Sequence, residues 1–203
     1  MTGPEHGILG VVLAHLGFHQ RWGWRITAVM GVASLLPDVD ALSYLAGGMA
    51  FSRYHRGPTH SLGGALALSC LLALTCLMVL WVARRVAAQW RRRGPPPLWL
   101  DELAAPTGGP LAGFGVVAGA SMVAMAAHLL VDALYPWPMP LLWPLSGARF
   151  CLALFGWADA GVLAILLATM FALGIWRTRS RRAAVGGIAA LTAYVGARAL
   201  LGA

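Results

Sequence analysis

The sequence predicts an all-α fold: a polytopic bundle of membrane helices, with four strong spans and two short apolar helices at the N-terminus. Composition is the first observation behind this prediction. Of the 203 residues, 59% are hydrophobic and 11% are charged, whereas a soluble domain has ~25% charged residues. The second observation is that the apolar residues form several long runs, and a helix needs ~20 such residues to cross a bilayer.

The basic residues give a third observation. All fifteen are arginine, and eleven of them lie in three segments between apolar runs, at 19–25, 84–93 and 177–182. The positive-inside rule produces this pattern, so we expect these segments in the cytoplasm. A net charge of +8 would also suit nucleic acid. However, no basic stripe is interleaved with aromatic residues, so we predict no nucleic-acid partner.

The N-terminal part predicts short elements. Residues 4–19 and 26–36 are apolar runs too short for a full span, and the second of them stops at Pro37. Residues 41–54 are mixed in character, with a break expected at Gly47-Gly48.

The rest of the chain alternates between spans and loops. We expect one membrane domain over residues 1–203, in which an Arg- and Pro-rich cytoplasmic loop at 84–110 and a Pro- and Trp-rich loop at 135–150 separate the helices. The four strong spans are expected at 62–83, 111–134, 151–176 and 184–201.

The heptapeptide His55-Arg56-Gly57-Pro58-Thr59-His60-Ser61 lies directly before the apolar run 62–83. Gly57-Pro58 predicts a tight turn. Thr59 is then expected to cap the following helix, with His60 in its first turn. Taken alone, the segment could also be an interfacial loop whose polar residues face lipid headgroups.

With the Arg-rich segments in the cytoplasm, the remaining loops alternate to the outside. The outer face then receives ionisable residues that have no ordinary reason to occur in a membrane protein. These residues are His6, Asp38, Asp40, His55, His60, His128 and Asp132.

Spacing suggests how these residues could act together. His128 and Asp132 are four residues apart, which places both side chains on one face of a helix. They could share a metal ion or form a hydrogen-bonded pair. Asp38 and Asp40 directly follow Pro37 and could chelate one ion or bridge two. Alternatively, they are the polar end of a helix, where a carboxylate is unfavourable for the helix dipole.

Four histidines and three aspartates form a mixed nitrogen and oxygen ligand set. Such a set suits Zn²⁺, Mn²⁺ or Fe²⁺ better than Ca²⁺. We therefore predict that all seven residues are metal ligands, and this number suggests two or more ions. Asp40 or His55 would handle protons, and Arg56 could hold a phosphate with two hydrogen bonds. The alternative for Arg56 is an ion pair with headgroups or with Asp38.

The order of these elements resembles the YdjM-like family of bacterial inner-membrane proteins, also described as LexA-binding membrane hydrolases. Five segments between about residues 5 and 150 carry the resemblance, and the last two helices carry none of it. They are Glu5-His6-Gly7-Ile8-Leu9, Leu35-Leu36-Pro37-Asp38-Val39-Asp40, the heptapeptide, Ala127-His128-Leu129-Leu130-Val131-Asp132 and Leu141-Leu142-Trp143-Pro144-Leu145.

The resemblance implies a metal-dependent hydrolase of the bacterial inner membrane. One position departs from the pattern: family members often have His after the second aspartate, where this chain has Ala41. The order of His and Asp residues is also loosely similar to zinc-dependent phospholipase C enzymes, which favours phosphoester substrates.

Together these observations predict a membrane-embedded hydrolase that acts on a lipid or lipid-linked ester at the outer leaflet. The alternatives are a metal or proton transporter and a scaffold whose loops are held by metal. A transporter would spread its ionisable residues through the depth of the membrane, whereas here they collect at one face. His15 and His19 are expected to lie outside the site.

Overall fold

The computed structural model describes residues 3–104, 113–156, 159–175 and 180–201. In these ranges the regular secondary structure is helical, apart from an isolated β-bridge between Met139 and Phe150. The predicted all-α fold is confirmed. The helices are α1 (Gly3–Ala14), α2 (Phe18–Ala33), the 3₁₀ helix η1 (Leu36–Ala46), α3 (Gly48–Tyr54), the 3₁₀ helix η2 (Pro58–His60), α4 (Leu62–Arg91), α5 (Leu98–Ala104), α6 (Phe114–Asp132), α7 (Ala160–Ile175) and α8 (Ser180–Leu201).

Three helices, α4, α6 and α8, are long and apolar enough to cross a membrane. The pair α2 and η1 passes the same test together, although the chain bends by 43° between them. By length and composition, the described residues therefore hold three spans, or four if the bent pair counts as one.

The predicted span at 151–176 is shorter in the structure, because residues 151–156 are not helical and α7 begins at Ala160. The backbone N–H of Leu152 donates to the carbonyl oxygen of Ala133 at 2.6 Å, and that of Leu154 donates to Leu134 at 2.7 Å. These bonds tie the segment to the chain that follows α6. Asp159 then caps α7 by accepting from the N–H of Val162 at 3.0 Å.

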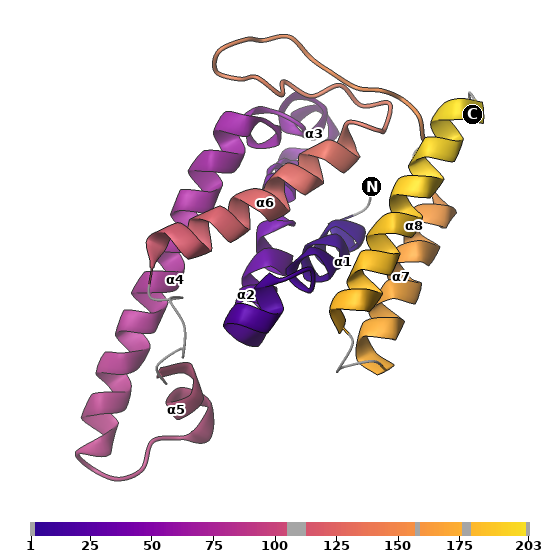
Figure 1. The fold of residues 1–203 in the computed structure, drawn as a ribbon. Helices are drawn as coiled ribbons and strands as arrows, with labels where there is room; N and C mark the ends of the chain where they lie inside the picture. The colour runs from indigo at the N-terminus through magenta and orange to yellow at the C-terminus, as the bar shows by residue number, and fades with distance from the viewer. Residues whose placement is uncertain (1–2, 105–112, 157–158, 176–179, 202–203) are drawn as a thin grey trace.

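The N-terminal residues form a helical hairpin, α1 and α2, in the middle of the molecule (Figure 1). A Cβ atom at Gly10 would lie 2.4 Å from the carbonyl oxygen of Met30, so glycine is required where these helices meet. The expectation that residues 19–25 form a separate segment between two apolar runs is wrong. The chain turns at 15–17, and residues 19–25 belong to α2, which has one non-helical residue at Gly23.

The predicted loop at 84–110 is partly helical. Residues 84–91 extend α4, and residues 98–104 form α5, while 105–112 lie outside the described residues. Leu100 and Ala104 of α5 pack against Ala83 and Ala87 of α4. This packing on an alanine face explains why the arginine-rich sequence continues the helix.

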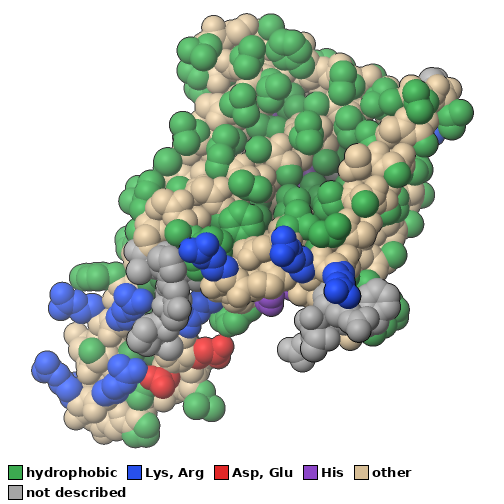
Figure 2. Space-filling model, viewed as in Figure 1, with side chains coloured by type: hydrophobic (Ala, Val, Ile, Leu, Met, Phe, Trp, Pro, Cys, Tyr) green, Lys and Arg blue, Asp and Glu red, His purple; other side chains and the backbone are tan. Residues whose placement is uncertain are grey.

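The two ends of the molecule differ in chemistry. The segment between α6 and α7 crosses the top of the view in Figure 1, close to α3 and the start of α4. Arginine side chains gather at the opposite end, around the end of α4 and α5 (Figure 2). The helices therefore separate a histidine and aspartate centre, described next, from an arginine-rich end.

Candidate metal centre

Four side chains from three parts of the chain meet at one point. Asp38 comes from η1, His60 from η2, and His128 and Asp132 from the last turns of α6. One ligand atom of each lies within 4.8 Å of the others. His60, His128 and Asp132 are buried, while the side chain of Asp38 is 21% exposed. Two imidazoles and two carboxylates at this separation could hold a divalent metal ion.

The imidazole of His128 is fixed from behind. Its Nδ1 lies 2.7 Å from the carbonyl oxygen of Ser34. A carbonyl can only accept, so Nδ1 carries the hydrogen and Nε2 of the neutral ring presents its lone pair to the centre. This arrangement, in which one ring nitrogen donates to an oxygen and the other faces the ligand position, is usual for histidine ligands of metals.

His60 is fixed in the same way, with a carboxylate as the acceptor. Its Nδ1 lies 3.1 Å from Asp40 Oδ2, and its Nε2 lies 3.3 Å from Asp38 Oδ1. The two aspartates therefore hold opposite nitrogens of one ring. They diverge because η1 is a 3₁₀ helix with ~3 residues per turn, so side chains two residues apart point in different directions.

The imidazoles of His60 and His128 would repel each other if both were neutral. The Nε2 atoms of His60 and His128 are 3.4 Å apart, and both Nδ1 atoms are already committed as donors. Two lone pairs would face one another across this distance. A proton on His60 removes the conflict in the metal-free protein, and a cation placed between the rings and the carboxylates of Asp38 and Asp132 would also remove it.

Asp40 lies behind the cluster and receives four hydrogen bonds. Its Oδ1 accepts from His55 Nδ1 at 2.9 Å, and its Oδ2 accepts from the Arg56 backbone N–H at 3.0 Å, Thr59 Oγ1 at 2.6 Å and His60 Nδ1 at 3.1 Å. Thr59 was predicted to cap α4, but Ser61 does so by accepting from the Gly64 N–H at 2.9 Å. The hydroxyl of Thr59 supports Asp40 instead.

Arg56 contacts both the cluster and the segment between α6 and α7. One guanidinium nitrogen, Nη2, lies 2.9 Å from Asp132 Oδ2, and Nη1 donates to the carbonyl oxygen of Trp137 at 3.0 Å. The side chain is 8% exposed. Its backbone has φ of 56°, a left-handed conformation that costs roughly 1–2 kcal/mol for a residue with a side chain. The bond from its N–H to Asp40 helps to hold this conformation.

His6 of α1 approaches the cluster from the other side. Its Nε2 lies 3.2 Å from Asp132 Oδ1, and its ring stacks on His128 with centroids 3.7 Å apart. His6 is fully buried, and the neighbouring Glu5 is 3% exposed. His6 therefore positions both a carboxylate and an imidazole of the cluster.

All seven predicted ligands lie at this end of the molecule, at different distances from its centre. Asp38, His60, His128 and Asp132 form the cluster; His6 touches Asp132, and Asp40 and His55 lie behind His60. The four cluster residues could hold a metal ion, and metal binding by any of the seven stays a prediction. His15 and His19 stack on each other, with centroids 4.2 Å apart, at the turn of the α1–α2 hairpin.

Sequence reasoning missed the oxygens that orient the cluster. Ser34 and Trp137 both act through their backbone carbonyl oxygens. Every residue type has this oxygen, so the sequence cannot show which residues use it. Thr59 stood inside the heptapeptide but was assigned a different partner. One sequence signal for close packing was available, the glycine at position 64. A Cβ atom there would lie 2.0 Å from the carbonyl oxygen of Pro58, so the turn that holds His60 packs directly on α4.

The fold and the cluster define the class of the protein. It is an α-helical membrane protein with a buried group of Asp and His side chains that could hold a metal ion. A family model described as "YdjM inner membrane protein" matches residues 1–203. The chain therefore belongs to the YdjM inner membrane protein family, as its motifs predicted. No curated protein and no solved structure matches it.

Removing a cluster donor tests metal binding directly. His60→Ala, His128→Ala and Asp132→Ala should each lower the metal content of the purified protein, because each removes one of four donors. His15→Ala and His19→Ala are matched controls, since they remove a stacked imidazole from the other end of the same hairpin and should leave metal content unchanged. Elemental analysis in detergent measures this. Equal metal content in wild type and all three cluster variants would identify the cluster as a hydrogen-bonded polar core.

The pH dependence of metal affinity should follow His60, which precedes the span α4. Burial disfavours its charged form, but the hydrogen bonds to Asp38 and Asp40 outweigh burial and raise the pKa of His60 to about 9. Metal must displace this proton, so affinity should rise ~10-fold per pH unit up to about pH 9 and then level off.

The metal-free protein should show the opposite trend in stability. The imidazolium of His60 stabilises the fold fully below its unfolded pKa of ~6.5, and this contribution is lost as pH rises through about 9. Metal titrations and thermal unfolding between pH 6 and pH 10, with and without chelator, measure both trends. An affinity independent of pH would show that His60 is not protonated before metal binds.

Proposed function

We propose that the protein is a membrane-embedded, metal-dependent hydrolase of a lipid or lipid-linked ester, with a phosphoester as the favoured substrate. One observation carries the proposal: two imidazoles, each held from behind by an oxygen acceptor, direct their Nε2 atoms to a point shared with two carboxylates. A metal-free polar core needs a proton on His60 to bring these nitrogens together, whereas a cation could be held by all four donors at once.

The donor set fits a divalent ion, with Zn²⁺ favoured and Mn²⁺ or Fe²⁺ also compatible. When bound, such an ion would supply Lewis-acid activation of a water and of an ester oxygen. Four donor groups match the ligand number of one zinc ion. A second ion, which seven candidate ligands suggested, stays a prediction.

His55 is the residue best placed to move a proton. Its Nδ1 is bonded to Asp40, as in the carboxylate–imidazole pairs that orient a general base. Its side chain is 25% exposed, and its ring centroid lies 5.5 Å from that of His60. Asp40 accepts four hydrogen bonds already, so in this proposal it orients His55 and His60.

Arg56 is proposed to bind the anionic group of the substrate. Its guanidinium lies beside Asp132 at the edge of the cluster, where an oxygen held at the cluster would also be within its reach. Guanidinium binds phosphate with two parallel hydrogen bonds. The pair with Asp132 compensates a buried carboxylate, which explains why the guanidinium is in place before any substrate binds.

Lipid substrates are supported by exposed apolar side chains on two segments that also carry or contact residues of the centre. The segment η1–α3, which carries Asp38, exposes Leu45 at 86% and Met49 at 90%. The segment between α6 and α7, which contacts Arg56, exposes Trp143 at 43% and Leu145 at 92%. Exposed apolar side chains on segments that contribute to a polar centre favour a substrate that approaches from the bilayer.

A metal-stapled scaffold is the alternative that a specific observation favours. Asp38, His60, His128 and Asp132 could fill all four positions of a tetrahedral ion, and structural zinc sites are closed in this way. A hydrolase needs a position for water. Asp38, the partly exposed member, is the ligand whose release would open one. Absorption spectra of the Co²⁺-substituted protein distinguish the two cases, since closed four-coordinate Co²⁺ absorbs far more strongly than five-coordinate Co²⁺.

We further propose that the centre faces the non-cytoplasmic side of the inner membrane. The arginines gather at the opposite end (Figure 2), and arginine-rich ends stay in the cytoplasm. In a cysteine-free background, Ala148→Cys should be labelled by an impermeant reagent in intact cells, while Arg92→Cys should require permeabilised cells. The reverse pattern would place the centre in the cytoplasm.

Arg56→Lys separates substrate binding from metal binding. Lysine keeps the positive charge next to Asp132, so metal content should be preserved, but it loses the two-pronged geometry. Hydrolysis of the favoured lipid should fall by ~10- to 100-fold, which corresponds to about 1.4–2.8 kcal/mol. Metal content and hydrolysis are measured on the same preparations, over a panel of phosphoester and carboxylester lipids.

Two further variants serve as controls for the Arg56→Lys experiment. His60→Ala should lose metal and activity together, while His15→Ala should lose neither. Wild-type rates for Arg56→Lys on every lipid would remove Arg56 from substrate binding. No hydrolysis of any panel member by fully metallated wild type would favour the transporter or scaffold.

A further inference from the structure

The end of α4 forms a second distinctive feature, far from the metal centre along the same helix. α4 has 30 residues and is therefore about 45 Å long, whereas the hydrocarbon core of a bilayer is ~30 Å thick. A helix of this length that begins at one surface of the bilayer would place its last turns in the headgroup layer of the other, because the bilayer with its headgroups is ~40–45 Å thick. We call residues 81–104, which comprise these turns and α5, the α4–α5 arm.

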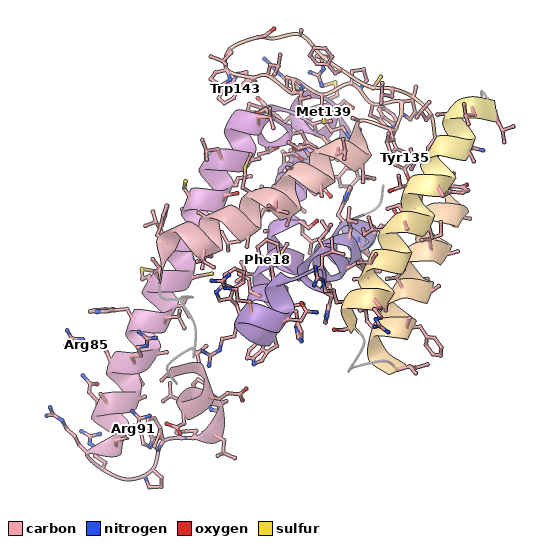
Figure 3. All side chains as sticks on the ribbon, viewed as in Figure 1. Phe18, Arg85, Arg91, Tyr135, Met139 and Trp143 are labelled. Atoms are coloured by element: carbon pink, nitrogen blue, oxygen red, sulfur yellow. The ribbon has the colours of Figure 1, made fainter. Side chains whose placement is uncertain are left out.

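The α4–α5 arm is a folded unit with an excess of positive charge. Gly94-Pro95-Pro96-Pro97 reverses the chain so that α5 packs on α4. An ion pair between Arg91 and Asp101 fixes the two helices, and the guanidinium of Arg25 donates to the carbonyl oxygen of Glu102. Figure 3 shows Arg85 and Arg91 on the part of α4 that lies beside α5. The arm carries five arginines and two acidic residues.

A hollow in the arm combines charge with apolar surface. Its volume is about 830 Å³, and it is lined by Val86, Gln89, Trp90, Arg92 and Arg93. Both arginines are exposed, and Trp90 is 47% exposed. On α5 of the same arm, the side chains of Leu98 and Trp99 are 89% and 67% exposed. Exposed tryptophan next to arginine is typical of the headgroup layer of a membrane.

We propose that this hollow binds the headgroup of an anionic phospholipid in the leaflet at the arginine-rich end. Arg92 and Arg93 hold the phosphate by charge-assisted hydrogen bonds, and Trp90 and Val86 contact the glycerol and the upper acyl chain. A soluble anion would satisfy the arginines but would leave the apolar side chains of the hollow, Val86 and Trp90, in water. A membrane lipid would cover these side chains as well, so the hollow fits a lipid better.

Native mass spectrometry of the full-length protein tests this proposal. The purified protein is mixed with equal amounts of phosphatidylglycerol and phosphatidylcholine that have the same acyl chains, and the retained lipids are counted. Wild type should retain phosphatidylglycerol preferentially. Arg92→Gln with Arg93→Gln should lower the ratio of the two lipids by roughly 5- to 20-fold, the expected effect of losing two exposed charge-assisted contacts.

The matched control is Arg181→Gln with Arg182→Gln, which removes the same charge from exposed positions at the start of α8. It should keep the wild-type ratio. An equal fall in both double variants would show a diffuse effect of charge and would overturn the specific site. A second pair, Arg92→Lys with Arg93→Lys, keeps the charge and should give an intermediate ratio because lysine binds phosphate without the two-pronged geometry; a full wild-type ratio would also overturn it.

Competition identifies the kind of ligand. Excess inorganic phosphate or a short oligonucleotide should not displace the retained phosphatidylglycerol, because neither covers the apolar wall. Displacement by either at micromolar concentration would assign the hollow to a soluble anion or to nucleic acid. None of these outcomes depends on metal or on hydrolysis. A failure of lipid binding can therefore be distinguished from a failure of the proposed hydrolase activity.

Discussion

The carboxylate of Asp40 is the contact on which the geometry of the metal centre depends. It joins η1 to the heptapeptide by accepting from His55, Arg56, Thr59 and His60. Because these donors are partly or fully buried, losing the acceptor would leave several of them unsatisfied, at ~1–3 kcal/mol each. The orientation of His60, the left-handed backbone of Arg56 and the position of His55 all follow from this one side chain.

The protein itself offsets part of the negative charge at the centre. Asp38, Asp40 and Asp132 bring three carboxylates to a largely buried region, where an uncompensated charge is costly. Arg56 and protonated His60 offset part of this charge without metal. A divalent ion would replace the proton and add further compensation. The same residues can therefore hold the site together in both states, so the metal-free fold need not collapse around its carboxylates.

Residue type and spacing predicted which end of the molecule holds the chemistry. They did not reveal how Asp38 and Asp40 divide their roles, because this depends on η1 being a 3₁₀ helix and not an extended segment. They also assigned Thr59 to the wrong partner, since a threonine before a helix is equally suited to capping and to bonding a distant carboxylate. The oxygens that orient His128 and Arg56 belong to the backbone, so no sequence pattern could have marked them.

Placement of the centre at helix ends has a physical reason. In the middle of a span the backbone carbonyls are used by the helix itself, whereas past its last turn they are free for side chains. The carbonyl of Ser34 lies just past the end of α2 and accepts from His128, and that of Trp137 lies beyond α6 and accepts from Arg56. Both orienting bonds need such carbonyls. The short helices η1 and η2 add further chain ends at the same level. A site that needs several acceptors, and access for a lipid, is therefore easier to build where helices stop than where they cross.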